Sequence, residues 1–93
     1  MHYLYIIYSQ NIDRYYVGET SNVADRLILH NSHHYSKSFT KSASDWKIKL
    51  EFECLLKSDA LYLERFVKRM KSKKFNKKVI NNPLILKDIL EKR

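Results

Sequence analysis

The chain has 93 residues, and its 18 Lys and Arg side chains exceed its 10 Asp and Glu side chains, which gives a net charge of +8. A single Gly, a single Pro and a single Cys exclude a low-complexity or collagen-like chain, an intrachain disulfide framework and a two-cysteine zinc motif. The longest apolar run, residues 3–8, is too short to span a bilayer, and the N-terminal residues lack the pattern of a secretory signal. We therefore expect one basic, cytoplasmic domain over residues 1–93.

The first 18 residues predict a β-hairpin. Residues 3–8 are rich in β-formers and are typical of a buried strand. Residues 9–13 are polar and turn-prone, and residues 14–18 return to β-forming side chains. The only glycine, Gly18, ends the second strand, where it would permit either a positive φ or the close approach of a substrate backbone.

A helix and a polar connector come next. Ser21 and Asn22 offer N-cap oxygens, and Asp25 suits the first turn of a helix that fades near residues 32–35. Residues 36–45 are mostly polar and predict a connecting segment.

Residues 46–54 carry the clearest period-2 pattern in the chain. Apolar side chains alternate with charged ones, which predicts a strand with one buried and one solvent-facing side. The apolar positions are Trp46, Ile48, Leu50, Phe52 and Cys54, and the charged positions are Lys47, Lys49, Glu51 and Glu53.

Two helices complete the predicted order. Ser58 and Asp59 are the expected cap of a long helix that runs through about Lys73, and a short helix follows Pro83. The order β-β-α-β-α-α predicts an α+β fold in which a small antiparallel sheet is flanked by helices.

The positive charge is concentrated in the second half of the chain. Residues 1–56 hold six basic and six acidic side chains, whereas residues 57–93 hold twelve basic and four acidic ones. Crowded cations repel one another unless an anion neutralises them, so a nucleic acid is the favoured partner over a solvated helix face or an anionic membrane surface. Eight cations without an intervening acid make up this run: Arg65, Lys68, Arg69, Lys71, Lys73, Lys74, Lys77 and Lys78.

Several residues can carry chemistry. Arg26 and His30 share one helix face and are either a phosphate clamp with a proton-transfer group or an exposed Arg beside a half-buried His. Glu64 is either the partner of Lys68 in a helical ion pair, worth about 0.2–0.5 kcal/mol, or an oxygen ligand for Mg²⁺. The seven tyrosines are core side chains or phenols that contact phosphate and transfer protons.

The order of these residues resembles the GIY-YIG endonuclease family. The triplets Tyr3-Leu4-Tyr5 and Tyr16-Val17-Gly18 are separated by ten residues, and Arg26 and Glu64 follow on separate helices. The resemblance covers roughly residues 3–80 and is strongest to short single-domain bacterial members, and the chain is also similar to the N-terminal nuclease domain of the excision-repair C subunit. It implies a three-stranded antiparallel sheet flanked by helices.

The resemblance also implies a set of site residues. Gly18, which closes the second triplet, and the eight cations of residues 65–78 are the expected nucleic-acid contacts, and Asn81 or Asn82 could replace Asn76 in the set. Tyr3 stands where the first triplet of the family has Gly, and Glu19 stands where some relatives have Lys. The implied catalytic residues are Tyr5, Tyr16, Arg26, His30, Glu64 and Asn76, with Glu64 as the metal ligand.

The activity implied by the resemblance is hydrolysis of phosphodiester bonds in DNA, rather than RNA, by an endonuclease with one Mg²⁺ or Mn²⁺. Arg26 would stabilise the charge of the transition state, and Tyr16, Tyr5 or His30 would position or deprotonate the attacking water. Structure-selective or weakly sequence-specific cutting in DNA repair or processing is expected. The alternatives are a non-catalytic nucleic-acid-binding module and a nuclease subunit whose protein partner supplies specificity.

Overall fold

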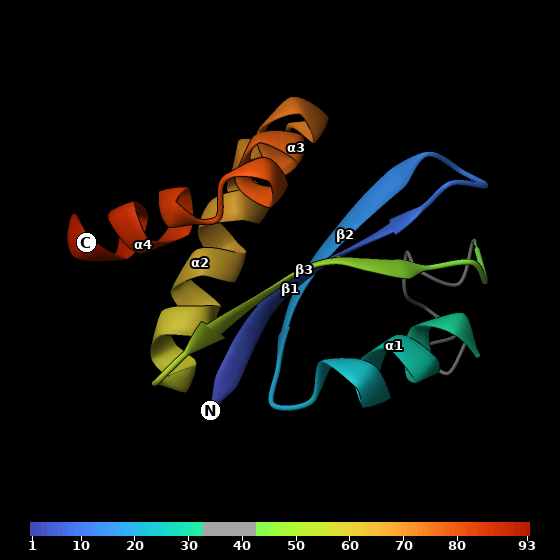
Figure 1. Ribbon diagram of the computed structural model, residues 1–93, viewed down its shortest axis with the longest axis horizontal. Coiled ribbons are helices and arrows are strands. Elements are labelled where there is room, and N and C mark those ends of the chain that lie inside the picture. The colour runs from blue at the N-terminus through green and yellow to red at the C-terminus, as the bar shows by residue number, and fades with distance from the viewer. Residues whose placement is uncertain (33–42) are drawn as a thin grey trace.

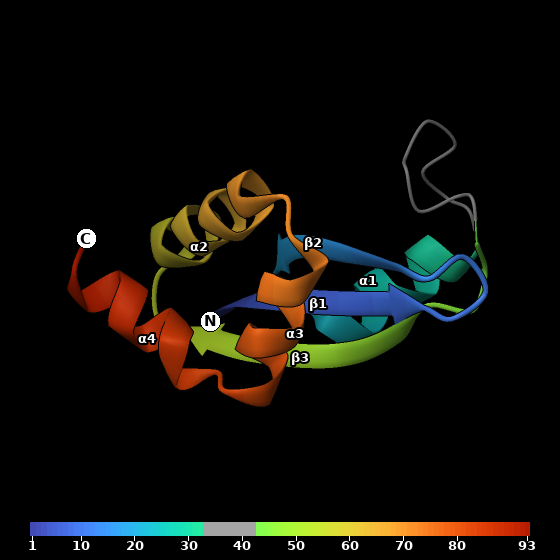
Figure 2. The ribbon, with the colours of Figure 1, turned by 90° about the horizontal axis from the view of Figure 1, so that it is seen from above.

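The computed structural model describes residues 1–32 and 43–93, which form a three-stranded antiparallel sheet and four helices (Figure 1). Strand β1 lies in the middle of the sheet, in the order β2-β1-β3 (Figure 2). This arrangement confirms the predicted α+β fold and the predicted order of elements. The elements are β1 (His2–Ser9), β2 (Arg14–Thr20), α1 (Val23–Asn31), β3 (Lys47–Cys54), α2 (Lys57–Met70), α3 (Lys73–Asn81) and α4 (Leu84–Glu91).

Helices cover both faces of the sheet. Helix α1 lies on one side, and α2, α3 and α4 lie on the other (Figure 1). Alternate side chains of β1 therefore enter two separate cores: Leu4 and Ile6 pack with residues of α2, α3 and α4, whereas Tyr5 and Ile7 pack with Val23 of α1. Burial on both faces explains why residues 3–8 form a continuous apolar run without alternation.

The edge strand β3 buries side chains on both of its faces, so the prediction of a single buried side is wrong. Its pairing with β1 is irregular between Ile6, which lies opposite Leu50, and Ile7, which lies opposite Ile48. Lys49 is the extra residue of this bulge, and a bulge moves the following side chains to the other face. Leu50 consequently joins the core under α2, and Ile48 joins the core under α1.

The side chains of Asn31 and Asp45 attach the segment before β3 to helix α1 and to the β1–β2 hairpin. The Asn31 side chain at the end of α1 accepts a hydrogen bond from the Trp46 backbone N–H at 2.8 Å and donates one to the Trp46 carbonyl at 3.1 Å. Buried Ser9 donates to Asp45 at 2.5 Å, and the Asn11 N–H donates to the other Asp45 oxygen at 3.0 Å. Residues 36–42 of the polar connector predicted over residues 36–45 lie outside the described part of the chain.

The second half of the chain differs from its prediction at both ends of α2. The helix begins at Lys57, after Leu56 as a cap without a side-chain hydrogen bond, so the expected capping by Ser58 or Asp59 is wrong. It ends at Met70 because Lys71 adopts a left-handed conformation with φ of 48°. Ser72 then caps a new helix, α3, by accepting a hydrogen bond from the Phe75 N–H.

The basic run is therefore folded as two helices joined by a turn, where the sequence predicted one continuous helix through Lys73.

The N-cap of α1 at Asn22 agrees with the prediction, since the Asn22 side chain accepts a hydrogen bond from the Asp25 N–H. Among the described residues, no helix combines the length and the apolar composition needed to cross a membrane.

Gly18 lies directly opposite Tyr5 in the antiparallel pair of β1 and β2. Its φ is not positive, so of the two roles considered for this glycine the left-handed turn is excluded. The Tyr5 ring instead occupies the space beside it: a Cβ at position 18 would lie 2.5 Å from the Tyr5 hydroxyl oxygen and 2.6 Å from Cζ. Glycine is required here because the ring of a buried tyrosine crosses the neighbouring strand.

Replacement of Gly18 by Ala should destabilise the fold. The added methyl overlaps the Tyr5 ring, and overpacking of this kind costs about 1–3 kcal/mol. Urea unfolding should therefore show a lower midpoint with an unchanged m-value. A midpoint equal to or above that of the wild type would contradict this packing, because Gly→Ala at an unstrained position is neutral or stabilising.

Candidate active site

The residues expected at the site converge first on a buried pair between β1 and α1. Tyr5 is 1% exposed and His30 is 2% exposed. Their side chains are hydrogen-bonded, with 2.8 Å between the Tyr5 hydroxyl oxygen and His30 Nε2. The antiparallel pairing aims Tyr5 at the face that α1 covers, and the last turn of α1 brings His30 onto it.

His30 is held in its neutral form. Burial and the charge of Arg26, one helical turn earlier, lower the pKa of His30 from 6.5 to about 4. The imidazole is therefore uncharged at neutral pH and can act as a proton acceptor. Because the Arg26 charge contributes to the lowered pKa of His30, Arg26 lies within electrostatic reach of the Tyr5–His30 pair, as the i,i+4 spacing predicted.

Tyr16 connects this pair to the opposite side of the sheet. Its ring meets the His30 ring edge-on at a centroid distance of 4.9 Å and lies 6.4 Å from the Tyr5 ring. On α2, the Lys68 ammonium group lies 5.2 Å from the centroid of the same ring. Tyr16 is on the edge strand β2, so groups from α1 and α2 can approach it from both faces of the sheet.

Glu64 adjoins this cluster through Lys68. The Lys68 ammonium group donates to Glu64 Oε2 at 3.2 Å, and the Glu64 side chain is 20% exposed. The helical ion pair considered from the sequence is therefore present. A single partly exposed carboxylate fits Mg²⁺ or Mn²⁺, because Mg²⁺ commonly binds through one or two carboxylates and keeps several waters. Among the described residues, no group of three or more His, Cys, Asp or Glu side chains could form a fuller cage.

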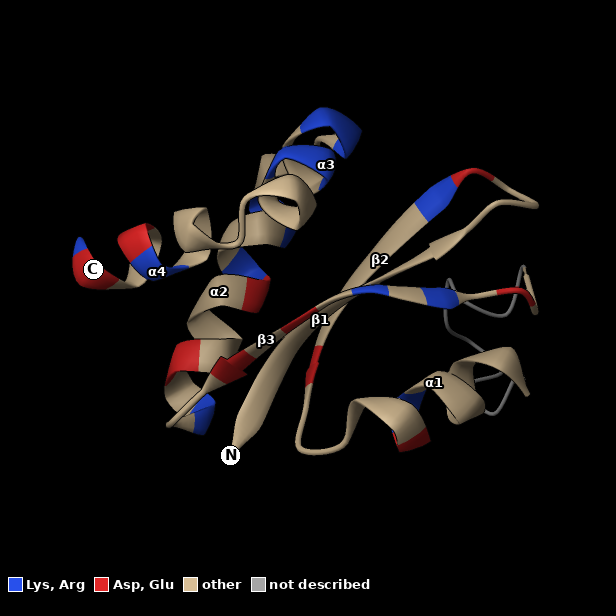
Figure 3. Ribbon diagram, viewed as in Figure 1, with Lys and Arg blue, Asp and Glu red and all other residues tan. Residues whose placement is uncertain are grey.

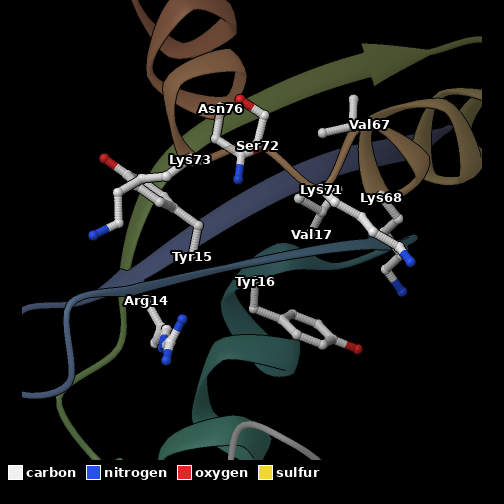
Figure 4. Close-up of a pocket in the computed structure, with 10 residues that line it drawn as sticks. All are labelled: Arg14, Tyr15, Tyr16, Val17, Val67, Lys68, Lys71, Ser72, Lys73 and Asn76. Atoms are coloured by element: carbon white, nitrogen blue, oxygen red, sulfur yellow. The ribbon is translucent and has the colours of Figure 1, made fainter.

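A groove of about 290 Å³ lies between β2 and the junction of α2 with α3, and we call it the β2 groove (Figure 4). Asn76 lies in its wall, and its buried Oδ1 has no hydrogen-bond partner among the described residues. A buried oxygen of this kind costs about 1–3 kcal/mol unless a ligand or water satisfies it. The lining residues are Arg14, Tyr15, Tyr16, Val17, Val67, Lys68, Lys71, Ser72, Lys73 and Asn76.

Only three of the eight cations of the basic run line the β2 groove. The turn at Lys71 and Ser72 directs Lys68, Lys71 and Lys73 to the β2 groove, and the other cations lie elsewhere on α2 and α3 (Figure 3). Those that do not line the groove are Arg65, Arg69, Lys74, Lys77 and Lys78. Asn81 and Asn82 end α3 and do not line the groove either.

Some residues of the groove were not singled out from the sequence. Arg14 precedes Tyr16 by two residues on the same strand, and period-2 alternation was the signal that could have placed both on one face. Ser72 could be identified only once the helix break was known. Glu19, by contrast, does not line the groove, and its carboxylate oxygen lies 2.5 Å from His2 Nδ1.

Comparison with protein families places most of the chain in a known family. A family model described as the GIY-YIG catalytic domain matches residues 1–78. Searches of curated proteins and of solved structures give no significant match. The matched residues include Tyr5, Tyr16, Arg26, Glu64 and Asn76, and they leave out all of α4 and the last three residues of α3. Because the match covers most of the chain, the protein belongs to the GIY-YIG family of nuclease domains.

Proposed function

We propose that this protein is a metal-dependent endonuclease that hydrolyses phosphodiester bonds in DNA. The observation that carries the proposal is the position of Tyr16, between the buried Tyr5–His30 pair on one side and the Lys68–Glu64 pair on the other. This places phenol, neutral imidazole, carboxylate and ammonium groups around the end of a cationic groove. A purely structural role for Tyr16 would not need these groups to converge.

Tyr16 is half-buried and lines the groove, so its phenol can contact a water molecule there, and it is the lining tyrosine whose ring contacts His30. Tyr5 is buried behind it and bonded to His30. We assign Tyr16 to binding the attacking water, and the Tyr5–His30 pair to accepting the proton that the water loses. A neutral imidazole hydrogen-bonded to a phenol can accept a proton, and the low pKa of His30 means that it releases this proton again readily.

Arg26 and Glu64 supply the charges. Arg26 contributes a fixed positive charge on the His30 side, where it would stabilise the additional negative charge of the transition state. Glu64 would hold one Mg²⁺ or Mn²⁺, which when bound supplies Lewis-acid polarisation of the phosphate. Asn76 offers a buried amide oxygen that a hydrogen-bond donor in the groove would satisfy.

We expect the protein to cut DNA according to its structure, or with only weak preference for its sequence. The cations of the groove and of α3 are suited to phosphates, and phosphate contacts position a nucleic acid without reading its bases. Preference for DNA over RNA, a protein partner that adds specificity, a role in repair or processing and a cytoplasmic location remain predictions.

One observation favours a second candidate, a nucleic-acid-binding module without catalysis. Lys68 neutralises the carboxylate of Glu64 in this structure. If that ion pair persists with the metal present, it opposes metal binding at Glu64 by offsetting the carboxylate charge and occupying one of its oxygens, and the groove would then bind nucleic acid without cutting it.

Cleavage assays decide between the two candidates. Wild-type protein with Mn²⁺ or Mg²⁺ should cut at least one member of a panel of duplex, single-stranded, flap and branched DNAs. Glu64→Gln and Arg26→Gln should each lower the single-turnover rate by roughly a hundredfold or more, the effect of removing one preorganised transition-state contact. Glu91→Gln, which removes a carboxylate from α4, is the matched control and should cut normally. Salt-sensitive binding without any cutting would establish the binding module instead.

The neutral His30 predicts how stability depends on pH. The unfolded chain takes up a proton near pH 6.5, whereas the folded protein resists it until about pH 4. The folded state should therefore lose about 2–3 kcal/mol as the pH falls from 6.5 to 4. Urea unfolding at successive pH values measures this loss.

His30→Gln is the control for that measurement, because it keeps a polar side chain but cannot titrate. Asp13 and Asp45, whose pKa values are lowered by their hydrogen bonds to Lys73 and Ser9, titrate in both proteins. The difference between the two curves isolates His30. Equal pH dependence in wild type and variant would show that His30 is not held neutral by the fold.

A further inference from the structure

The β2 groove extends past Tyr16 and carries more positive charge than the proposed chemistry uses. Four cations line it, on β2, at the end of α2 and at the start of α3, and no acidic side chain does. Two of them have partners: Lys68 pairs with Glu64, and Lys73 pairs with Asp13 in the hairpin turn. The side chains of Arg14 and Lys71 form no ion pair or hydrogen bond within the part of the chain that the structure describes.

In the view of Figure 4, Arg14 and the ammonium group of Lys71 lie to the two sides of Tyr16. Arg14 and Tyr16 point from β2 in the same direction, away from the junction of α2 with α3, and the Lys71 side chain extends from that junction toward the hydroxyl end of Tyr16. Two residues along a strand span about 6.6 Å, which is comparable with one nucleotide step of an extended strand. A strand whose scissile phosphate lies at Tyr16 would therefore bring the next phosphate to Arg14 and the preceding one toward Lys71, or the reverse.

We propose that the β2 groove binds the two phosphates that flank the scissile phosphate, with Arg14 holding one and Lys71 the other. The proposal rests on the proposed nuclease function. An unpaired cation binds phosphate without first giving up a carboxylate, and a guanidinium can hold two phosphate oxygens at once. The backbone N–H groups at the start of α3, which have no acceptor within the helix, add positive potential to the same wall.

This assignment gives the groove a role distinct from that of the remaining basic residues. Contacts to phosphates on both sides of the scissile bond fix the register of the strand over Tyr16 and Glu64 without reading a base. The cations of the basic run that do not line the groove add general attraction, which does not set register; they are Arg65, Arg69, Lys74, Lys77 and Lys78.

Binding measured without metal tests the groove independently of cleavage. The affinity for a 20-base-pair DNA duplex is measured in chelator at several salt concentrations, for wild type and for Arg14→Gln combined with Lys71→Gln. Each lost phosphate contact lowers the slope of log K against log salt by about 0.9, so the double variant should lose about 1.8 and bind at least roughly tenfold more weakly. Lys57→Gln combined with Lys87→Gln removes the same charge from exposed positions outside the groove and should leave the slope unchanged.

Neutral phosphates then locate the contacts. On a substrate whose major cut site has been mapped, a methylphosphonate replaces the phosphate on one or the other side of the cut. Arg14→Gln should make cleavage insensitive to one replacement, and Lys71→Gln should make it insensitive to the other. If both variants respond like wild type to both replacements, or if the double variant keeps the salt slope of the control, the groove assignment is overturned. Wild-type protein that shows no salt-dependent binding at all would overturn the proposed function as well.

Discussion

The structure depends on the burial of β1 on both of its faces. This strand pairs with β2 on one side and β3 on the other, and its side chains enter two cores. Every other element must therefore direct its apolar side chains to one face or the other. Helix α1 takes the face of Tyr5, and α2, α3 and α4 take the face of Leu4. The bulge in β3 meets the same requirement, because it lets one edge strand supply side chains to both cores.

The position of the site follows from this two-sided cover. The edge strand β2 is the place where α1 and α2 come near each other around the sheet, and Tyr16 lies between them. The two helices bring chemically different groups: a neutral imidazole and a guanidinium from α1, and a carboxylate with its ammonium partner from α2. The absence of a side chain at Gly18 belongs to the same arrangement, because it leaves room for the ring of Tyr5.

Charge is organised by pairing as much as by number. Lys68 and Lys73 are held by carboxylates, and Asp13 reaches Lys73 from a hairpin turn in which its own backbone has φ of 51°. Arg14 and Lys71 have no ion-pair partner among the described residues, and they line the same groove as Tyr16. A count of basic residues predicts attraction to a polyanion, whereas the pairing determines which cations bind a phosphate without breaking an existing ion pair.

The sequence by itself determined the order of the strands, the α+β class and the family, and it predicted a set of site residues from Tyr5 to Asn76. These features depend on local propensity, on alternation and on the spacing of a few polar residues, which can be read along the chain. Tertiary structure alone decided three others. The single helix expected through Lys73 became two, because Lys71 adopts a left-handed conformation and Ser72 caps a new helix. The buried side of β3 changed at Lys49, because an edge strand between two cores can supply both. Arg14 joined the site because β2 is an edge strand facing the turn between α2 and α3, a neighbourhood that no spacing along the chain encodes.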